Sequence, residues 1–356
     1  MAKERIGVFG GTFDPVHVGH LLLAESARDR AGLSKVLFMP THIQPFKQDE
    51  ETSPDDDRIR MLRLATRDNP GLGVTTIETD KGGISYTIDS LRALKEEYRD
   101  KSICFIIGTD MFLMIGKWKE ADALIREFDF VVGVRTGYMH DDAVRKAEEL
   151  RASHGARIEL IDNPPIELSS TGIRDRLKNG SSIRYLVPES VRRYLMAMEK
   201  EGERRFAHTK RVIDLALVLA ARFGVDADKA ETAALLHDYC KDSKGGIEND
   251  LGHGKMAAEA AREEFGVTDE DILNAIRWHT TGRAGMSKLE KILFLADTIE
   301  PGRKYDSITA LREACMEDLD RGALRVLVEL KEYLLKKGLV ATGDTEAAIA
   351  ELKELN

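Results

Sequence analysis

The stretch Gly10-Gly11-Thr12-Phe13-Asp14-Pro15-Val16-His17-Val18-Gly19-His20 organises the first half of this chain. An apolar run over residues 5–9 precedes it and helical spacing over 21–30 follows, so we expect a strand, a glycine turn and a helix in that order. Such a turn presents backbone N–H groups to an anion, and the helix N-terminus adds partial positive charge. His17 and His20 share one helix face, so the stretch predicts a phosphate site with two imidazoles.

Two other interpretations of this stretch are weaker. A dinucleotide-binding motif requires a third glycine where this chain has Asp14 and Pro15. An ordinary turn with incidental histidines does not account for the strand, the paired glycines, the His-x-x-His spacing and the helix in this order.

Length and composition limit the classes of protein. A chain of 356 residues is long enough for two domains, and its net charge of −9 argues against binding nucleic acid through bulk charge. Three scattered cysteines indicate no disulfide framework and fit a reducing compartment. The sequence shows no signal-like segment and no apolar run near the roughly 20 residues that span a bilayer. We therefore expect a cytoplasmic protein without nucleic-acid or membrane partners, and a homo-oligomer stays open.

Strands and helices alternate over the first half. The apolar runs that predict strands after the first one are 35–39, 72–77, 102–107, 128–134 and 158–161. This alternation predicts a Rossmann-like, doubly wound parallel sheet, with ligands at the carboxyl ends of the strands. Gly10, Gly108, Asp110 and Arg135 all lie at such ends.

The pattern changes near residue 188, beyond which no strand is predicted. The later segments with helical spacing are 206–223, 227–237, 255–265, 269–278, 287–299, 307–337 and 344–355. We therefore predict an α/β domain over 1–197, a charged linker over 198–204 that contains Gly202, an all-α domain over 205–340 and a polar helical tail over 341–356.

A second anion site is predicted at residues 168–174, Leu-Ser-Ser-Thr-Gly-Ile-Arg, where hydroxyls, backbone N–H groups and an arginine meet a helix N-terminus. Together with the first motif it resembles the closing signature of the nucleotidyltransferase superfamily. Residues 85–91, 105–110, 118 and 135–138 narrow the resemblance of the first half to bacterial nicotinate-nucleotide adenylyltransferases. The resemblance implies adenylyl transfer from ATP, with Mg²⁺ on its phosphates, to nicotinate mononucleotide in NAD biosynthesis.

This resemblance also implies roles for particular residues, with His17 and His20 as the catalytic pair. The residues implied to contact the phosphates are Gly10, Thr12, Phe13, His17, His20, Lys47, Ser170, Thr171 and Arg174. Those implied for the rest of the nucleotides are Gly108 and Asp110 at the adenosine, Thr87 and Trp118 at the pyridine, and Arg135.

The identity of the acceptor stays open at this point. Lys119 stands where many members of the family carry a second aromatic residue, which leaves nicotinamide mononucleotide as an alternative. Pantetheine-phosphate adenylyltransferases share both signatures, but their chains are shorter and are not expected to contain the Ser85-Tyr86-Thr87 or Trp118 segments. Cytidylyltransferases share the histidine pair in a less similar context.

The second half contains a set of imidazoles and carboxylates in the order His, His-Asp, His, His, Asp. These candidate metal ligands are His208, His237, Asp238, His253, His279 and Asp297. Such ligands suit Fe, Mn, Co, Ni or Zn, and six of them suffice for two ions that share a bridging hydroxide. Asp238 and Asp297 lie within apolar helical stretches, where an unpaired carboxylate is costly.

Residues 208–211, 234–241, 278–283 and 296–303 resemble the HD phosphohydrolase superfamily, and within it the YqeK-type symmetrical diadenosine-tetraphosphate hydrolases. The resemblance implies cleavage of diadenosine tetraphosphate into two ADP with two transition-metal ions, iron or manganese. One metal would be held by His208, His237, Asp238 and Asp297, and the other by His253, His279 and the shared Asp238. The catalytic and phosphate-binding residues implied here are Asp238, Lys241, Arg211, Arg283 and Arg303.

The sequence thus predicts a bifunctional enzyme of nucleotide metabolism. One alternative keeps the transferase and makes the helical half a metal-bound sensor or docking module. Another makes that half a different phosphohydrolase, such as an RNA-related or signalling phosphodiesterase, against which the acidic net charge argues weakly.

Overall fold

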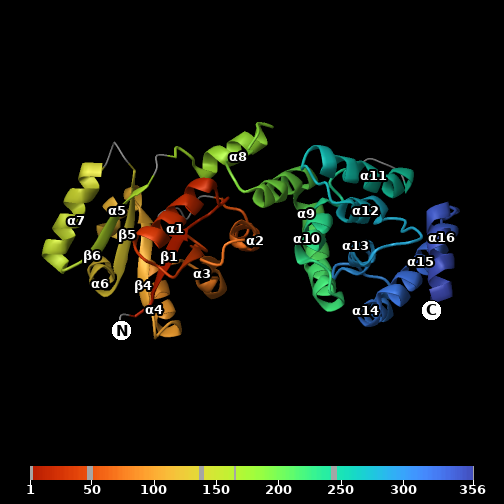
Figure 1. Ribbon diagram of the computed structural model, residues 1–356, viewed down its shortest axis with the longest axis horizontal. Coiled ribbons are helices and arrows are strands. Elements are labelled where there is room, and N and C mark those ends of the chain that lie inside the picture. The colour runs from red at the N-terminus through yellow and green to blue at the C-terminus, as the bar shows by residue number, and fades with distance from the viewer. Residues whose placement is uncertain (1–2, 46–50, 136–139, 164–165, 242–246, 356) are drawn as a thin grey trace. The chain divides into compact units, whose positions relative to one another are not determined.

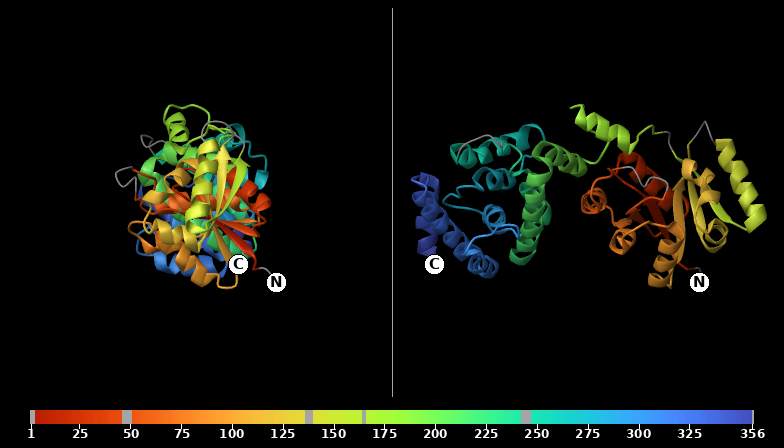
Figure 2. Two further views of the ribbon diagram at one scale, coloured as in Figure 1. Left: turned by 90° about the vertical axis from the view of Figure 1, so that its left-hand side faces the viewer. Right: turned by 180° about the vertical axis from the view of Figure 1, so that it is seen from behind.

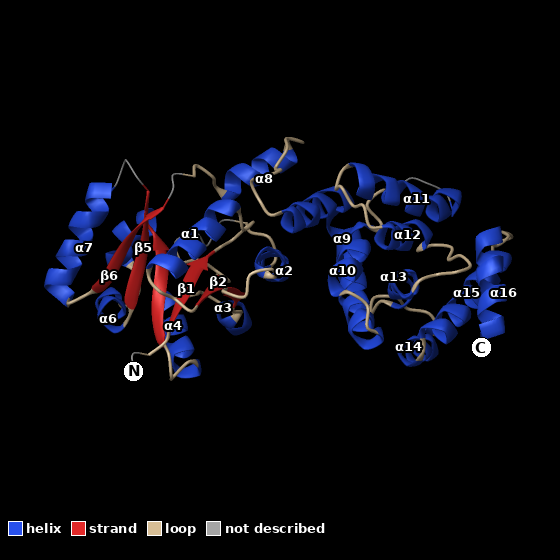
Figure 3. Cartoon of the chain, in the orientation of Figure 1, coloured by secondary structure: helices blue, strands red, loops and turns tan. Residues whose placement is uncertain are grey.

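The computed structural model describes residues 3–45, 51–135, 140–163, 166–241 and 247–355 (Figure 1). The chain divides into two compact units, Met1–Arg192 and Arg193–Asn356. In the described part of the chain, all named strands lie in the first unit (Figure 3). Also within that part, no helix combines the length and apolarity needed to cross a membrane.

The first unit is built on a six-stranded sheet with strand order β3-β2-β1-β4-β5-β6, and all strand pairs are parallel. The strands are β1 (Arg5–Gly11), β2 (Lys35–Pro40), β3 (Leu72–Val74), β4 (Ser102–Gly108), β5 (Asp129–Arg135) and β6 (Arg157–Asn163). This arrangement confirms the expected doubly wound sheet. The chain leaves β1 toward β2 and returns to place β4 on its other side, so β1 and β4 form the switch point beside which ligands bind in such sheets.

Helices cover both faces of this sheet (Figures 1 and 2). The helices of the first unit are α1 (Val18–Arg30), α2 (Asp55–Thr66), α3 (Ile77–Lys81), α4 (Thr87–Glu97), α5 (Thr109–Leu113), η1 (Ile115–Lys117), α6 (Ala121–Glu127), α7 (His140–His154) and α8 (Ser170–Lys178). One face packs against α4, α6 and α7 through Val8, Phe105 and Val132. On the opposite face α1 lies so close that a side chain at Gly133 of β5 would overlap Leu23.

The second unit is helical over its described residues, as the sequence pattern predicts. Its helices are the later part of α9 (Glu189–Phe223), α10 (Ala227–Leu236), α11 (Ile247–Glu263), α12 (Glu270–Trp278), α13 (Lys288–Ile299), α14 (Ile308–Glu317), α15 (Leu319–Lys336) and α16 (Gly343–Leu355). Helix α9 is interrupted at Gly202, whose φ of 70° and ψ of 165° are not helical. The expected linker 198–204 surrounds this interruption, and the predicted domain boundaries stay a prediction.

Three expected elements differ from the structure. The strand expected over 72–77 ends at Val74, because helix α3 begins at Ile77, directly after Thr76, whose hydroxyl bonds the Asp80 side chain. The helix expected over 307–337 is split at Asp318, whose extended backbone and side chain cap α15 through the Arg321 N–H. The helix expected over 255–265 begins earlier, at Ile247, so that His253 lies within α11.

Candidate functional site

The first candidate site forms at the turn between β1 and α1. Phe13 occupies the left-handed region with a φ of 52°, which is unusual for a bulky residue, and its ring is buried. That ring packs edge-on against Phe9 and His20, with centroid separations of 5.4 and 5.0 Å. The aromatic packing thus holds the turn that the sequence predicts.

The two histidines of this turn stack on each other, with ring centroids 3.6 Å apart. The backbone N–H of His17 donates to Nδ1 of His20 at 3.2 Å, so a neutral His20 carries its proton on Nε2. Burial, and then the neighbouring His17, lowers the pKa of His20 well below its usual range. At neutral pH His20 is therefore an uncharged hydrogen-bond donor.

The second anion-binding segment lies directly against this turn. Ser170, at the start of α8, donates its hydroxyl to the Pro15 carbonyl at 2.9 Å. The Arg174 guanidinium donates to the Asp14 carbonyl at 2.5 Å and lies 3.6 Å from the Asp14 carboxylate. Segments that are 155 residues apart in the sequence therefore meet at one place.

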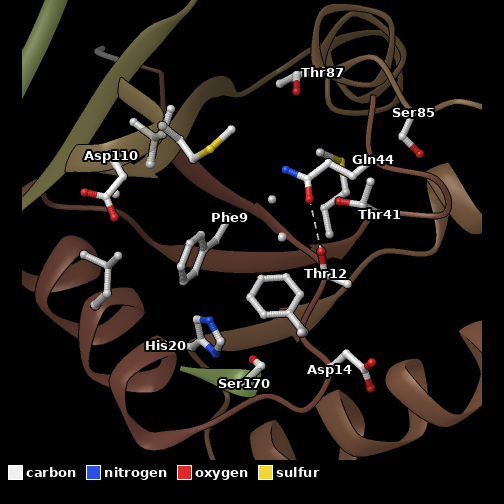
Figure 4. Close-up of a pocket in the computed structure, with 18 of the residues that line it drawn as sticks. Phe9, Thr12, Asp14, His20, Thr41, Gln44, Ser85, Thr87, Asp110 and Ser170 are labelled. Atoms are coloured by element: carbon white, nitrogen blue, oxygen red, sulfur yellow. Dashed lines mark hydrogen bonds between the residues drawn. The ribbon is translucent and has the colours of Figure 1, made fainter. Parts of the chain in front are cut away.

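Both segments line one cavity of about 950 Å³ at the carboxyl ends of β1 and β4 (Figure 4). The cavity walls include the expected residues Gly10, Thr12, Phe13, His17, His20, Thr87, Gly108, Asp110, Trp118, Ser170, Thr171 and Arg174. Lys47 lies outside the described residues. Arg135 ends β5, and its side chain is not among those that the structure describes.

Two lysines flank Trp118 at the end of the cavity formed by Tyr86 and Thr87. The Lys119 ammonium lies 4.4 Å from the centroid of the Tyr86 ring and 3.0 Å from the Asp89 carboxylate. The indole N–H of Trp118 is buried and has no hydrogen-bond partner within the described part of the chain. This end of the cavity therefore offers an aromatic face, positive charge and an unused donor.

Sequence reasoning missed two buried charged residues beside this cavity. Glu78 accepts a hydrogen bond from the Ser90 hydroxyl at 2.7 Å, and burial raises its pKa. Arg58 is fully buried and donates to the Thr12 and Ser53 carbonyls at 2.7 and 3.1 Å. Neither has a distinguishing sequence signal, because charged residues on short helices usually face solvent.

The second candidate site is a cluster of histidines and carboxylates from five helices and their ends. Donor atoms of His208, His237 and Asp297 lie within 4.8 Å of one another, as do those of His237, Asp238 and His279. His253 Nε2 lies 2.9 Å from the Asp238 carboxylate. All six expected ligands therefore meet in one cluster.

Hydrogen bonds orient these imidazoles for ligation. Nδ1 of His237 bonds the Ala234 carbonyl and Nδ1 of His279 bonds the Ile276 carbonyl, both at 2.7 Å. These bonds leave each Nε2 as the atom that faces the cluster. Burial lowers the pKa of His237 to about 4, so its imidazole is neutral at neutral pH, the form that binds metals.

The carboxylates of the cluster are ionised. Burial opposes this, but the hydrogen bond from His208, together with His237 and Arg303, lowers the pKa of Asp297. Nε2 of His237 is buried without a hydrogen-bond partner among the described residues. Ionised carboxylates beside a neutral His237 with such an orphaned nitrogen fit a divalent metal better than a structural network.

The four cations expected at this site are all ion-paired. Lys241 lies 3.1 Å from Asp238, and Arg303 donates to Asp297 at 2.8 Å. Arg211 and Arg283 instead pair with the buried carboxylates of Glu300 and Glu290, at 2.6 and 2.7 Å from the nearest oxygens. Only Lys241 and Arg303 contact expected metal ligands, and phosphate binding by all four stays a prediction.

Comparison with known proteins assigns both halves. The pattern described as cytidylyltransferase-like matches residues 8–176 and the pattern described as HD domain matches residues 205–302. A protein named "Probable nicotinate-nucleotide adenylyltransferase" from Moorella thermoacetica is 40% identical over 192 residues, covering 54% of this chain and 88% of that protein. One of the same name from Aeromonas salmonicida is 41% identical over 206 residues, covering 55% and 96%. The chain belongs to the nicotinate-nucleotide adenylyltransferase family.

A second domain accompanies the adenylyltransferase half in this member of the family. The HD domain that it carries implies divalent metal binding, in agreement with the cluster of imidazoles and carboxylates. Among solved structures, a predicted HD superfamily hydrolase involved in NAD metabolism from Clostridium acetobutylicum is 33% identical, covers 46% of this chain and 97% of that chain, and has a TM-score of 0.43.

Proposed function

We propose that the first unit transfers the adenylyl group of ATP to nicotinate mononucleotide, giving nicotinate adenine dinucleotide and pyrophosphate. The observation that carries this proposal is the single cavity lined by the His17–His20 turn and by Ser170 and Arg174, in a chain of this family. The reaction needs no protein nucleophile, because the phosphate of the mononucleotide attacks the α-phosphorus of ATP as pyrophosphate leaves. Positioning and electrostatic stabilisation supply the rate.

Each side of the cavity has a part in this reaction. Neutral His20 would donate from Nε2 to a phosphate oxygen, while Arg174 and the N-terminus of α8 add positive charge. Mg²⁺ bound with ATP would neutralise its phosphates. At the other end, Lys117 beside Trp118 favours an anionic pyridine carboxylate, and therefore nicotinate over nicotinamide, whereas the charge of Lys119 is paired with Asp89.

The test is product analysis of the full chain with ATP, Mg²⁺ and either nicotinate mononucleotide, nicotinamide mononucleotide or phosphopantetheine. We expect nicotinate adenine dinucleotide as the main product and a loss of about 100- to 1,000-fold in kcat for His20→Ala. His154→Ala, on α7 outside the cavity lining, is the matched control. Faster turnover of either other acceptor would overturn the assignment of the substrate.

We propose that the HD half hydrolyses diadenosine tetraphosphate to two ADP with two transition-metal ions, iron or manganese. The support is the cluster in which His237 belongs to both ligand triads and Asp238 lies near His253 and His279. When bound, the metal ions would supply Lewis acidity and a hydroxide nucleophile at neutral pH. Lys241 contacts Oδ2 of Asp238, and Arg303 donates to Oδ1 of Asp297, the oxygen that His208 also contacts, so both would place positive charge beside a bound phosphate.

The second activity is tested by incubating the full chain with diadenosine tetraphosphate and Fe²⁺ or Mn²⁺. We expect ADP as the product, and its complete loss in Asp238→Ala with the adenylyltransferase activity unchanged. Metal bound without ADP formation would favour the sensor or docking alternative. Preferential cleavage of another phosphodiester in a substrate panel would instead reassign the substrate.

A further inference from the structure

Three histidines of the metal cluster, His208, His237 and His279, are oriented in two different ways. His237 and His279 follow the last residues of α10 and α12, where the final carbonyls of a helix have no amide partner. In each histidine, Nδ1 donates to the carbonyl three residues earlier, that of Ala234 for His237 and that of Ile276 for His279, both at 2.7 Å. These two imidazoles are therefore oriented by their own helices.

His208 cannot be oriented in this way. It lies within α9, where the carbonyls of the preceding turn are engaged by backbone amides of the same helix. Its Nδ1 instead lies 3.1 Å from Oε1 of Glu300, the residue that follows α13. Its Nε2 then lies 3.0 Å from the Asp297 carboxylate, inside the cluster.

The Glu300 carboxylate is itself held firmly. Its side chain is 2% exposed, and it accepts hydrogen bonds from the Arg211 guanidinium at 2.6 and 3.3 Å. It also accepts the backbone N–H of Gly302, and the Arg303 guanidinium lies 3.9 Å away. A buried carboxylate with this many donors is ionised and has one orientation, and a carboxylate bound to an imidazole increases the basicity of the other ring nitrogen.

We propose that Glu300 is a positioning residue for the metal centre, which turns Nε2 of His208 toward the ion and strengthens it as a ligand. The proposal rests on the proposed metal-dependent function of the HD half. It also assigns Arg211 a supporting role, since its Nε donates to Oε2 of Glu300 and its Nη2 donates to Oε1, the oxygen that contacts His208. In this role Arg211 acts on the metal site through Glu300.

The test measures metal binding by the full chain, without substrate. Equilibrium dialysis against Mn²⁺ should show a 10- to 100-fold higher dissociation constant in Glu300→Ala, and a smaller change in Glu300→Gln, which keeps an acceptor for Nδ1 but lacks the charge. The matched control is Glu290→Gln. Glu290 is also 2% exposed and pairs with Arg283, but no contact joins it to the described ligands.

The possible outcomes separate the two proposals. Unchanged Mn²⁺ binding by folded Glu300→Ala overturns the positioning role, as does an equal loss in Glu290→Gln, which would indicate general destabilisation. Wild-type chain that binds no Mn²⁺ or Fe²⁺ contradicts the proposed metal-dependent function itself. Urea unfolding of each variant establishes that it is folded. A dissociation constant for Mn²⁺ that is closer to the wild-type value in Glu300→Gln than in Glu300→Ala supports the role of the acceptor oxygen.

Discussion

At the residue scale, the second unit contains a carboxyl group whose burial makes its charged form unfavourable. Glu201 is 8% exposed and accepts a hydrogen bond from the Thr209 hydroxyl at 2.6 Å. Burial raises its pKa from 4.5 to about 7, with the Asp238 charge adding to the effect. The folded state therefore binds this proton more tightly than the unfolded state does, so stability falls as pH rises through this interval.

We predict that Glu201→Gln stabilises the protein in a pH-dependent way. Glutamine keeps the acceptor for Thr209 but cannot ionise. The free energy of unfolding of the variant should therefore exceed that of the wild type only slightly near pH 4.5, and by about 3 kcal/mol above pH 7. Urea unfolding in metal-free buffer across this pH range measures the difference. The exposed Glu263→Gln serves as the control, and a gain that is independent of pH would contradict the prediction.

The residues that carry recognisable chemistry were predictable, whereas their supporting carboxylates were not. Glycine turns, paired histidines and the His-Asp dipeptide occur in combinations that few structural roles require, so His20 and Asp238 could be singled out. Glu78 is distinguished by its contact with Ser90 on the following helix, and Glu300 by its contact with His208, which lies 92 positions earlier in the chain. A lone glutamate on a helix ordinarily faces solvent, so only the packed structure identifies such a partner.

At the element scale, α11 packs tightly against the end of α12 at a glycine. A Cβ added to Gly254 would lie 2.8 Å from the carbonyl oxygens of both Ile276 and Arg277, and these are backbone atoms that cannot move aside. Gly254 follows His253, and the two carbonyls lie just before His279. The close approach therefore holds two expected metal ligands in contact, with their Nε2 atoms 3.0 Å apart.

We predict that Gly254→Ala separates these helices, lowers the free energy of unfolding by about 1–3 kcal/mol and weakens metal binding. Gly252→Ala is the matched control on the same helix, because nothing lies within 4 Å of the added Cβ. That control should be neutral or more stable by about 0.5–1 kcal/mol through helix propensity. Urea unfolding and Mn²⁺ dialysis measure both variants, and equal behaviour of the two would refute the steric argument.

Elements were predicted well where one pattern extends over many residues. The buried strands β4 and β5 are continuous apolar runs, and the helices of the second unit repeat their apolar positions for several turns. The errors lie where a local side-chain hydrogen bond accompanies the start of a new helix, as at Thr76 and Asp318. Both residues bond within four positions of themselves, and such bonds are too short-ranged to alter a hydrophobic period.

At the scale of the whole molecule, each of the two units contains its own candidate site. The sheet core of the first unit is formed within residues 6–158, and both ligand triads of the second unit lie within 208–297. The change in pattern near residue 188 predicted a second, helical domain, and the chain divides into its two compact units between Arg192 and Arg193, inside α9. The expected boundaries at 197 and 205 stay a prediction, because the helix continues through the point of division without a change of period.

We predict two unfolding transitions in calorimetry of the full chain. ATP with Mg²⁺ should raise the unfolding temperature of the first unit only, and Mn²⁺ without nucleotide that of the HD unit only. At a ligand concentration 100 times the dissociation constant, the free energy of unfolding of the unit that binds should increase by about 2.7 kcal/mol. Asp238→Ala should abolish the second effect and leave the first unchanged. One transition that both ligands shift together would show that the units unfold as one.

The contact between α8 and the first turn has a consequence for the order in which this enzyme matures on the ribosome. Ser170 and Arg174 bond the backbone of residues 14 and 15, so a nascent chain that has released only the glycine turn has half of its phosphate cradle. Competence to hold ATP should therefore arise late in translation, once residue 174 has left the exit tunnel, although the histidine pair is among the earliest segments to emerge.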